Sequence, residues 1–134
     1  MALTTIEKVL FLREIAFFKE IEYEKIARIA PLVKEIRFTK NTEFITQGEK
    51  GDCLYIIVDG EVNISIDGKP LDKIMRSMDV IGELAVLTDK PRAASCTALS
   101  DILTLKIDKK DFRDMMKIEP EIAFGVIQIL LQYI

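Results

Sequence analysis

Residues 53–68 read CLYIIVDGEVNISIDG and decide the fold class. The run from Cys53 to Val58 is apolar throughout, which is expected for a strand at a core position of a barrel or sandwich. A tight turn at Asp59-Gly60 follows, and apolar residues then alternate with polar ones from Val62 to Ile66, so one face of this second strand is buried and the other is wet. The pair Asp67-Gly68 favours a type I′ hairpin turn. The stretch therefore predicts β-strands joined by short turns.

Strand-like segments continue on both sides of this stretch. Ile36 and Phe38 alternate with polar neighbours, Phe44-Ile45 follows, and residues 93–98 and 102–107 complete a series of short segments separated by turn residues. Such spacing predicts a jelly-roll or β-roll barrel. The fold class that we expect is mainly β, a double-stranded β-helix with flanking N- and C-terminal α-helices.

The two ends of the chain have helical patterns. Thr4 with Glu7 fits a capping box, and Asp108 and Pro120 suit the starts of two later helices. With 134 residues the chain fits one domain. We expect that single domain over 1–134, with N-terminal helices over 1–32, the β-roll over 33–107 including a special segment at 80–97, and C-terminal helices over 108–134.

The final helical segment, residues 122–134, is apolar almost all round. A helix of that kind is expected to be buried on more than one side. It is too short to cross a bilayer, so we expect no direct membrane insertion by this segment. We interpret it as a surface for a second copy of the chain or for a downstream effector domain.

Composition excludes several function classes. The chain has no histidine, which excludes Ser-His-Asp and Cys-His catalysis, histidine metal sites and a cupin-like metalloenzyme. We therefore expect no enzymatic activity, no metal and no resident cofactor. The formal net charge of −3 argues against nucleic-acid binding.

Cysteine usage and the N-terminus indicate the compartment. The two cysteines, Cys53 and Cys96, are expected to be buried or free thiols, with a disulfide as the open alternative. Charged residues interrupt the N-terminal segment, which therefore lacks the shape of a signal peptide. We expect a cytoplasmic protein, or the cytosolic domain of a larger one.

Residues 80–97 interrupt the strands and carry the candidate chemistry. They read VIGELAVLTDKPRAASCT. A short helical turn is expected over residues 83–87 after Gly82, and its free backbone N–H groups favour an anion. Arg92 can bind a phosphate through two parallel hydrogen bonds, and the small residues 93–95 leave room for a ligand. The segment therefore predicts a phosphate cradle.

Glu83 narrows the class of ligand. A carboxylate beside a phosphate site repels the anion unless the ligand also offers a hydrogen-bond donor, and a ribose 2′-hydroxyl is such a donor. A 3′,5′-cyclic nucleotide has one phosphate charge and a free 2′-hydroxyl, so it suits one arginine and one glutamate. In the empty site Arg92 and Glu83 can pair with each other.

These residues also resemble a known family. The pattern Gly-Glu-Leu-Ala, five residues, then Pro-Arg-Ala-Ala-Ser/Thr is similar to the phosphate-binding cassette of cyclic-nucleotide-binding domains, and residues 82–95 match its nine fixed positions without insertion. Residues 47–62 resemble the glycine-marked roll core of the same family. It includes kinase regulatory subunits, catabolite-activator-type transcription factors and nucleotide-gated channels.

The resemblance implies a role for each site residue. Glu83 accepts a hydrogen bond from the ribose hydroxyl, Arg92 pairs with the cyclic phosphate, and Val62 touches the base. Ala93 stands where members that prefer cyclic GMP often carry Thr or Ser, so the resemblance implies cyclic AMP, with cyclic GMP as the alternative ligand. The ligand-binding residues that it implies are Gly82, Glu83, Leu84, Ala85, Arg92, Ala93, Ala94, Ser95 and Val62.

Three positions depart from the family pattern. Asn41 and Met78 replace common glycines, and Ile81 stands where phenylalanine is frequent. Asparagine tolerates the left-handed backbone that a glycine serves. The function that we expect is a non-catalytic sensor that binds a cyclic nucleotide and signals through its C-terminal helices. The alternative is a degenerate domain that keeps the fold as a ligand-independent protein interaction module.

Overall fold

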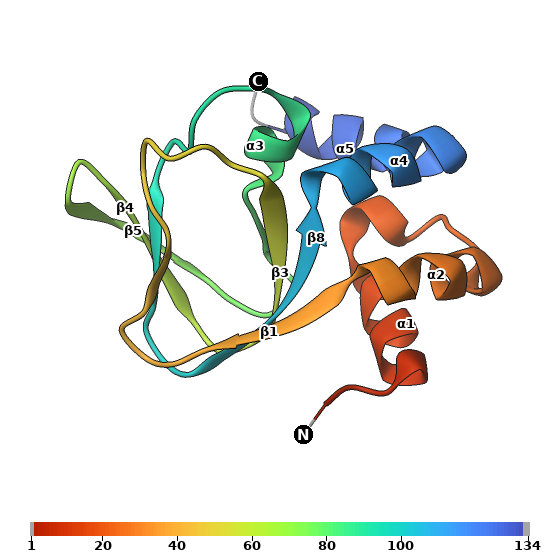
Figure 1. The fold of residues 1–134 in the computed structure, drawn as a ribbon, viewed down its shortest axis with the longest axis horizontal. Coiled ribbons are helices and arrows are strands. Elements are labelled where there is room, and N and C mark those ends of the chain that lie inside the picture. Colours follow the sequence, from red (N-terminus) through yellow and green to blue (C-terminus); the bar gives the residue numbers. More distant parts are fainter. Residues whose placement is uncertain (1, 133–134) are drawn as a thin grey trace.

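The strands form two antiparallel sheets that face each other as a roll (Figure 1). Within residues 2–132, which the computed structural model describes, each sheet has four strands. The first sheet has the order β1 (Lys34–Phe38), β8 (Ile102–Asp108), β3 (Cys53–Asp59) and β6 (Val80–Ile81). The second has the order β2 (Glu43–Ile45), β7 (Ser95–Ala98), β4 (Val62–Ile66) and β5 (Lys69–Met75).

The central strand β3 is apolar because both of its faces are buried. Leu54 and Ile56 belong to the core cluster between the first sheet and the helices, whereas Tyr55 and Ile57 belong to the cluster inside the roll. Successive side chains of a strand point to opposite faces, so a strand between two cores needs apolar residues at every position. The predicted core strand is thus confirmed, and the structure adds that it lies between two cores.

The β4–β5 hairpin has the predicted turn. Ile66 pairs with Lys69, and both Asp67 (φ 53°) and Gly68 (φ 77°) have the positive φ that a type I′ turn requires. The predicted β-roll with flanking helices is confirmed. In the part of the chain that the structure describes, no ladder closes the two sheets into one barrel.

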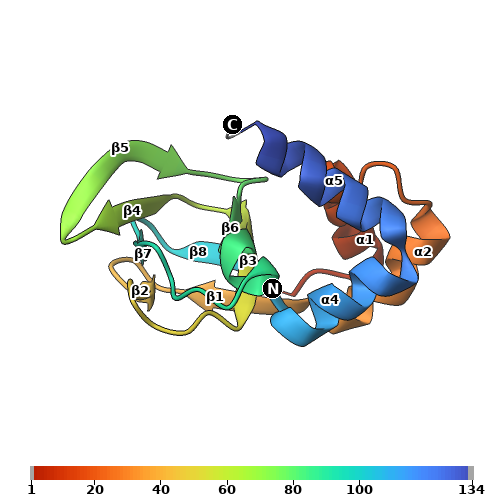
Figure 2. The same ribbon diagram turned by 90° about the horizontal axis from the view of Figure 1, so that it is seen from above.

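The helices collect at one end of the roll and cover the first sheet (Figures 1 and 2). The capping box is confirmed, since Thr4 Oγ1 accepts from the Glu7 amide at 3.1 Å and Glu7 Oε1 accepts from the Thr4 amide at 3.0 Å. Pro120 begins the last helix, as predicted. The helical elements are α1 (Thr5–Glu14), the 3₁₀ helix η1 (Ala16–Phe18), α2 (Tyr23–Ile29), the 3₁₀ helix η2 (Ala30–Leu32), α3 (Glu83–Leu87), α4 (Lys109–Ile118) and α5 (Pro120–Leu131).

Two local expectations need correction. The strand expected over 93–98 begins only at Ser95, because the two preceding residues line a cavity instead of pairing in the sheet. Asp108 does precede α4, but its side chain makes no capping hydrogen bond. Its carboxylate instead accepts from Lys34 Nζ at 2.8 Å, so it joins the start of α4 to β1.

The burial expected for the final helix is also wrong. Only one face of α5 is buried, through Ile122 and Val126, while Phe124, Ile127 and Leu131 are 61%, 51% and 58% exposed. Ile134, which completes the apolar pattern, lies outside the described residues. The mean hydropathy of the segment therefore reflects one buried face and a second apolar face on the surface.

Gly125 sets how closely α5 approaches η1. A Cβ atom added at Gly125 would lie 2.6 Å from Phe17 Cα, which is too close for any side chain. The helix backbone consequently rests directly on η1, and the rings of Phe17 and Phe112 meet edge to face at 5.5 Å between centroids. This contact fixes α5 beside the strands that carry the candidate site.

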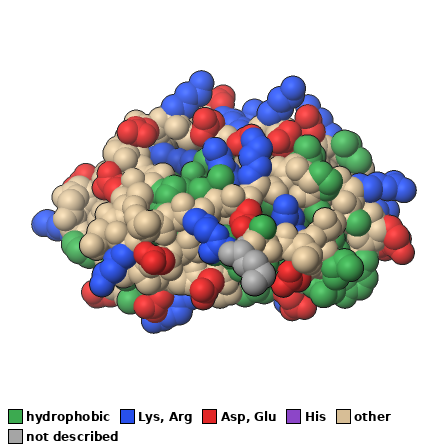
Figure 3. Space-filling view, turned by 60° about the horizontal axis from the view of Figure 1, so that its bottom comes forward, with side chains coloured by type: hydrophobic (Ala, Val, Ile, Leu, Met, Phe, Trp, Pro, Cys, Tyr) green, Lys and Arg blue, Asp and Glu red, His purple; other side chains and the backbone are tan. Residues whose placement is uncertain are grey.

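The state of the cysteines, the charges on the surface and the apolar character of the helices can be compared with the sequence-based expectations. Cys53 and Cys96 are both buried and free, as expected, and form no disulfide. The space-filling view shows Lys and Arg side chains interspersed with Asp and Glu across the face that it presents (Figure 3). None of the helices within residues 2–132 combines the length and the apolar character that crossing a membrane requires.

Candidate functional site

The short helix α3 carries the first half of the predicted cradle. It follows β6 through Gly82, whose φ of 88° is a left-handed conformation that glycine adopts without steric cost. Ala85 and Val86 anchor the helix in the protein, while Leu84 is 54% exposed at the surface. Figure 1 shows α3 on the roll beside β3 and close to the C-terminal helices.

Arg92 is buried and only partly satisfied. Its side chain crosses to β3, where Nη2 donates to the Cys53 carbonyl at 2.8 Å and lies 3.5 Å from the Cys53 sulfur. The residue is 9% exposed, and its Nη1 atom is buried without a hydrogen-bond partner. An unpartnered buried donor is costly, so this nitrogen is available to an acceptor that enters the site.

Two glycines make room for the Arg92 guanidinium. A Cβ atom at Gly82 would overlap Nη1, and a Cβ atom at Gly51 would lie 2.9 Å from Nε. The backbone of Arg92 is held as well, because its amide donates to the Glu49 carbonyl at 2.8 Å and its carbonyl accepts from the Gly48 amide at 2.9 Å. The two glycines and the two backbone hydrogen bonds together hold Arg92 in one geometry.

Arg92 lines a cavity of about 400 Å³ between the cassette and the second sheet. A cavity of this size suits a small-molecule ligand. Seven of the nine predicted site residues line it, namely Gly82, Glu83, Leu84, Ala85, Arg92, Ala93 and Ala94.

The structure places the other two predicted residues elsewhere. Val62 has no exposed surface and packs inside the roll, so it does not reach the cavity, whereas Ile64 on the same strand does. Ser95 lies just beyond the cavity wall, and its hydroxyl accepts from the Gln47 amide at 2.9 Å. Ser95 therefore stabilises the loop that leads to Gly48 and Glu49, which hold Arg92.

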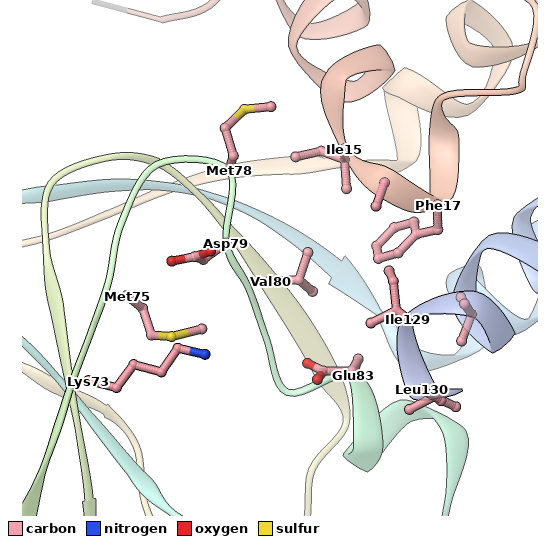
Figure 4. Close-up of a pocket in the computed structure, with 12 residues that line it drawn as sticks. Ile15, Phe17, Lys73, Met75, Met78, Asp79, Val80, Glu83, Ile129 and Leu130 are labelled. Atoms are coloured by element: carbon pink, nitrogen blue, oxygen red, sulfur yellow. The ribbon is translucent and has the colours of Figure 1, made fainter. Parts of the chain in front are cut away.

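Glu83 lies at the junction of this cavity with a smaller one of about 170 Å³. Burial raises the pKa of the Glu83 carboxyl, and the charge of Lys73 opposes that rise. Figure 4 shows the Lys73 side chain extending towards Glu83. No ion pair joins Glu83 to Arg92 among the described residues, because Arg92 turns to the Cys53 carbonyl, so the pairing considered for the empty site is not formed.

The smaller cavity connects the site to α5. Lys73, Met75, Val80 and Glu83 belong to both cavities, and the far wall of the smaller one includes Ile129 and Leu130 of α5 (Figure 4).

Sequence reasoning missed the contribution of β5 to both cavities. This strand is exposed at nearly every position, so its sequence carries no clear alternation, and only the turn before it indicated that a strand follows.

The three residues that depart from the family pattern fit the local backbone and the wall of the cavity. Asn41 and Met78 adopt φ values of 75° and 80°, so both accept the left-handed backbone. The Met78 amide donates to the Ile57 carbonyl at 2.9 Å, which holds the strained residue in place. Ile81 is buried and lines the larger cavity.

Taken together, the roll holds one cavity whose wall contains both the incompletely hydrogen-bonded Arg92 and the Glu83 carboxylate. A family model described as the cyclic nucleotide-binding domain matches residues 35–119. The chain belongs to the cyclic nucleotide-binding domain family. The strands β2 to β8, together with Glu83 and Arg92, lie within the matched region, whereas α1, α2 and α5 lie outside it.

Relatives in several organisms share this domain. The chain is 30% identical over 117 residues to a CRP-like cAMP-activated global transcriptional regulator of Mycobacterium tuberculosis, covering 84% of this chain and 52% of that protein. It is 35% identical over 97 residues to the cGMP-dependent protein kinase egl-4 of Caenorhabditis elegans, covering 72% of this chain and 12% of that protein. The chain thus spans about half, or less, of the length of these relatives.

A solved relative has the same fold. The regulatory domain of Toxoplasma gondii PKA, in a co-crystal structure with cAMP, superposes with a TM-score of 0.75 at 29% identity, covering 83% of this chain and 44% of that chain.

Proposed function

We propose that this chain is a non-catalytic regulatory domain that binds a cyclic nucleotide, and cyclic AMP in preference to cyclic GMP. The observation that carries the proposal is the buried Nη1 of Arg92, which has no partner and belongs to a side chain that lines the cavity. A cyclic phosphate supplies the missing acceptor together with the opposite charge. The relatives named above include proteins that respond to cAMP or cGMP, which supports the ligand class.

Each part of the nucleotide has a matching wall in the cavity. The phosphate pairs with Arg92 and with the backbone around it, and the ribose 2′-hydroxyl donates to Glu83. Ile64, Met75 and Val80 form an apolar wall for the base. The backbone groups that complete the phosphate cradle belong to Gly82, Leu84, Ala85, Ala93 and Ala94.

The cavity suits binding better than catalysis. Cys96 is a potential nucleophile in its wall, but burial raises the pKa of this thiol to about 11, so the thiolate is scarce at neutral pH. The preference for cyclic AMP rests on Ala93, which presents a methyl group to the cavity where the cyclic GMP-preferring members often have a hydroxyl.

The helix α5 transmits the effect of ligand binding to a partner. Ile129 and Leu130 face the smaller cavity beside Glu83, so they are the residues that cover the base when a nucleotide is bound. Binding then favours the arrangement in which α5 is closed, as a population shift requires. The exposed Phe124, Ile127 and Leu131 on the outer face offer a surface to a second copy or to an effector domain. We propose that the described roll and helices act as one domain in this process.

Calorimetric titration of the purified protein with cyclic AMP, cyclic GMP and 5′-AMP tests the proposal. We expect cyclic AMP to bind most tightly and 5′-AMP most weakly, because the site offers one buried arginine and a carboxylate for a single phosphate charge and a nearby hydroxyl. Binding of cyclic GMP at equal or higher affinity would overturn the base preference. A folded protein that binds none of the three would leave the ligand-independent interaction module as the better account.

A further inference from the structure

Two cations from α4 hold the carboxyl end of α3. Lys109 Nζ donates to the Thr88 carbonyl at 2.9 Å and to Asp89 Oδ1 at 3.1 Å, and Arg113 Nε donates to the Val86 carbonyl at 3.0 Å. The last carbonyls of a helix lack partners within the helix, and cations near them also oppose the negative end of its dipole. Lys109 and Arg113 lie four residues apart and hence on one face of α4. This face supplies partners that α3, with only five residues, lacks.

Lys109 also reaches the other side of the phosphate cradle, through its backbone. It is the first residue of α4, and its amide donates to the Asp52 carbonyl at 2.7 Å. Asp52 directly precedes Cys53, whose carbonyl accepts from Arg92 Nη2 at 2.8 Å. One residue of α4 is therefore bonded to Thr88, which caps the helix that carries Glu83, and to Asp52, which precedes the strand that orients Arg92.

The bond from Lys109 to the Thr88 carbonyl is the stronger of its two side-chain contacts. The Lys109 side chain is 17% exposed, whereas that of Asp89 is 94% exposed. Hydrogen bonds from Lys109 lower the pKa of Asp89, but an ion pair with so exposed a partner is screened by water and adds little stability. The shielded carbonyl bond thus keeps α3 and the start of α4 at a fixed separation.

We propose that Lys109 is a positioning residue that couples the phosphate cradle to α4 and α5. α4 leads into α5 at Glu119 with no intervening loop. A shift of α3 and Arg92 when the ligand binds therefore moves the first turn of α4 through Lys109, and α5 follows. The nature of the ligand in this inference rests on the proposed function, whereas the clamp itself is a property of the empty protein.

Amide hydrogen exchange tests the clamp in the empty protein and the ligand-dependent coupling to α5 separately. The variants are Lys109→Met, which removes the side-chain donors but keeps the backbone amide that bonds to Asp52, and Lys109→Arg, which keeps a cation with N–H groups. Lys110→Met is the matched control, because Lys110 is the exposed neighbour on the same helix. Exchange is followed over residues 83–92 in the empty protein and over residues 120–131 with and without saturating cyclic AMP.

We expect Lys109→Met to accelerate exchange over 83–92 about tenfold in the empty protein, which corresponds to about 1.4 kcal/mol, the size of one hydrogen bond from a charged group. It should also reduce the effect of cyclic AMP on residues 120–131, since only the Arg113 bond and the backbone bond to Asp52 remain, while Lys109→Arg and Lys110→Met resemble wild type. Unchanged exchange over 83–92 in Lys109→Met would overturn the clamp. An unchanged cyclic AMP effect on 120–131 in that variant would overturn the coupling. Failure of the wild-type protein to bind any cyclic nucleotide would refute the proposed function, and the empty-protein exchange would still decide the clamp.

Discussion

Replacing Arg92 with methionine should weaken nucleotide binding by orders of magnitude and leave the empty protein folded. In the empty site the guanidinium makes one strong hydrogen bond, from Nη2 to the Cys53 carbonyl, while Nη1 is buried without a partner. Methionine is an unbranched, apolar side chain that can fill the space without a buried charge. The substitution therefore acts on the bound state far more than on the folded state.

The magnitudes follow from the hydrogen bonds that change. Two bonds from Arg92 to a phosphate contribute about 1.5–3 kcal/mol each, so the dissociation constant of cyclic AMP should rise about 10²–10⁴-fold. Folding loses the bond to the Cys53 carbonyl but no longer buries the unpartnered Nη1, which costs about 1–3 kcal/mol. These effects oppose each other, and we expect the free energy of unfolding to change by less than about 1 kcal/mol.

Calorimetric titration and urea unfolding of the same preparations provide the two readouts. Arg76→Met is the matched control, since Arg76 is exposed and pairs with Glu61 away from the cavity. The control should bind like wild type. Arg92→Met that binds cyclic AMP within about fivefold of wild type would exclude Arg92 as the phosphate ligand, and an unfolded variant would make Arg92 a structural residue.

Three further predictions concern the wall of the cavity. Because burial raises the pKa of Glu83, the folded empty protein binds a proton above pH 4.5 that the unfolded chain has released. Its stability should then fall as the pH rises through that range, while affinity for cyclic AMP rises. Glu83→Gln should remove the pH dependence of stability in melting experiments and the pH dependence of cyclic AMP affinity in titrations. If either dependence persists in this variant, Glu83 is not the titrating group that causes it. Gly82→Ala should destabilise the protein by about 1–2 kcal/mol, because Gly82 has a left-handed φ. The added methyl group should also displace Arg92 Nη1 and so weaken cyclic AMP binding. Unaltered affinity in a folded variant would contradict the close packing of Gly82 against Arg92. Finally, Cys96, with a pKa of about 11, should react with a disulfide reagent at pH 8 far more slowly than the unfolded chain does, and equal rates would contradict its burial.

Local patterns in the sequence predicted the parts of the fold that depend on neighbouring residues. The hairpin at Asp67-Gly68 and the capping box at Thr4 need only a few adjacent positions, and both formed as expected. The apolar run of β3 correctly predicted a core strand, because a strand whose residues are nearly all buried has apolar side chains at consecutive positions. The strand β5 was indicated only by the turn before it, because its residues are exposed and show no clear alternation, so its contribution to the cavities was not predicted.

The interior of the site depends on contacts between distant segments, which no local pattern contains. Alternation places Val62 and Ile64 on the same face of β4, but it does not say that the cavity opens beside Ile64 only. The unpartnered Nη1 of Arg92 exists because Nη2 is taken by a carbonyl on another strand. The burial of α5 on one face likewise depends on where η1 lies. Hydropathy alone therefore overestimated how much of α5 is buried.

A crystal structure of the protein grown with saturating cyclic AMP would show whether the unpartnered nitrogen of Arg92 receives the cyclic phosphate. We expect a phosphate oxygen about 2.7–2.9 Å from Arg92 Nη1, with the ribose 2′-hydroxyl on the Glu83 carboxylate. A nucleotide bound elsewhere, or an empty cavity with Arg92 still bonded only to the Cys53 carbonyl, would contradict this expectation.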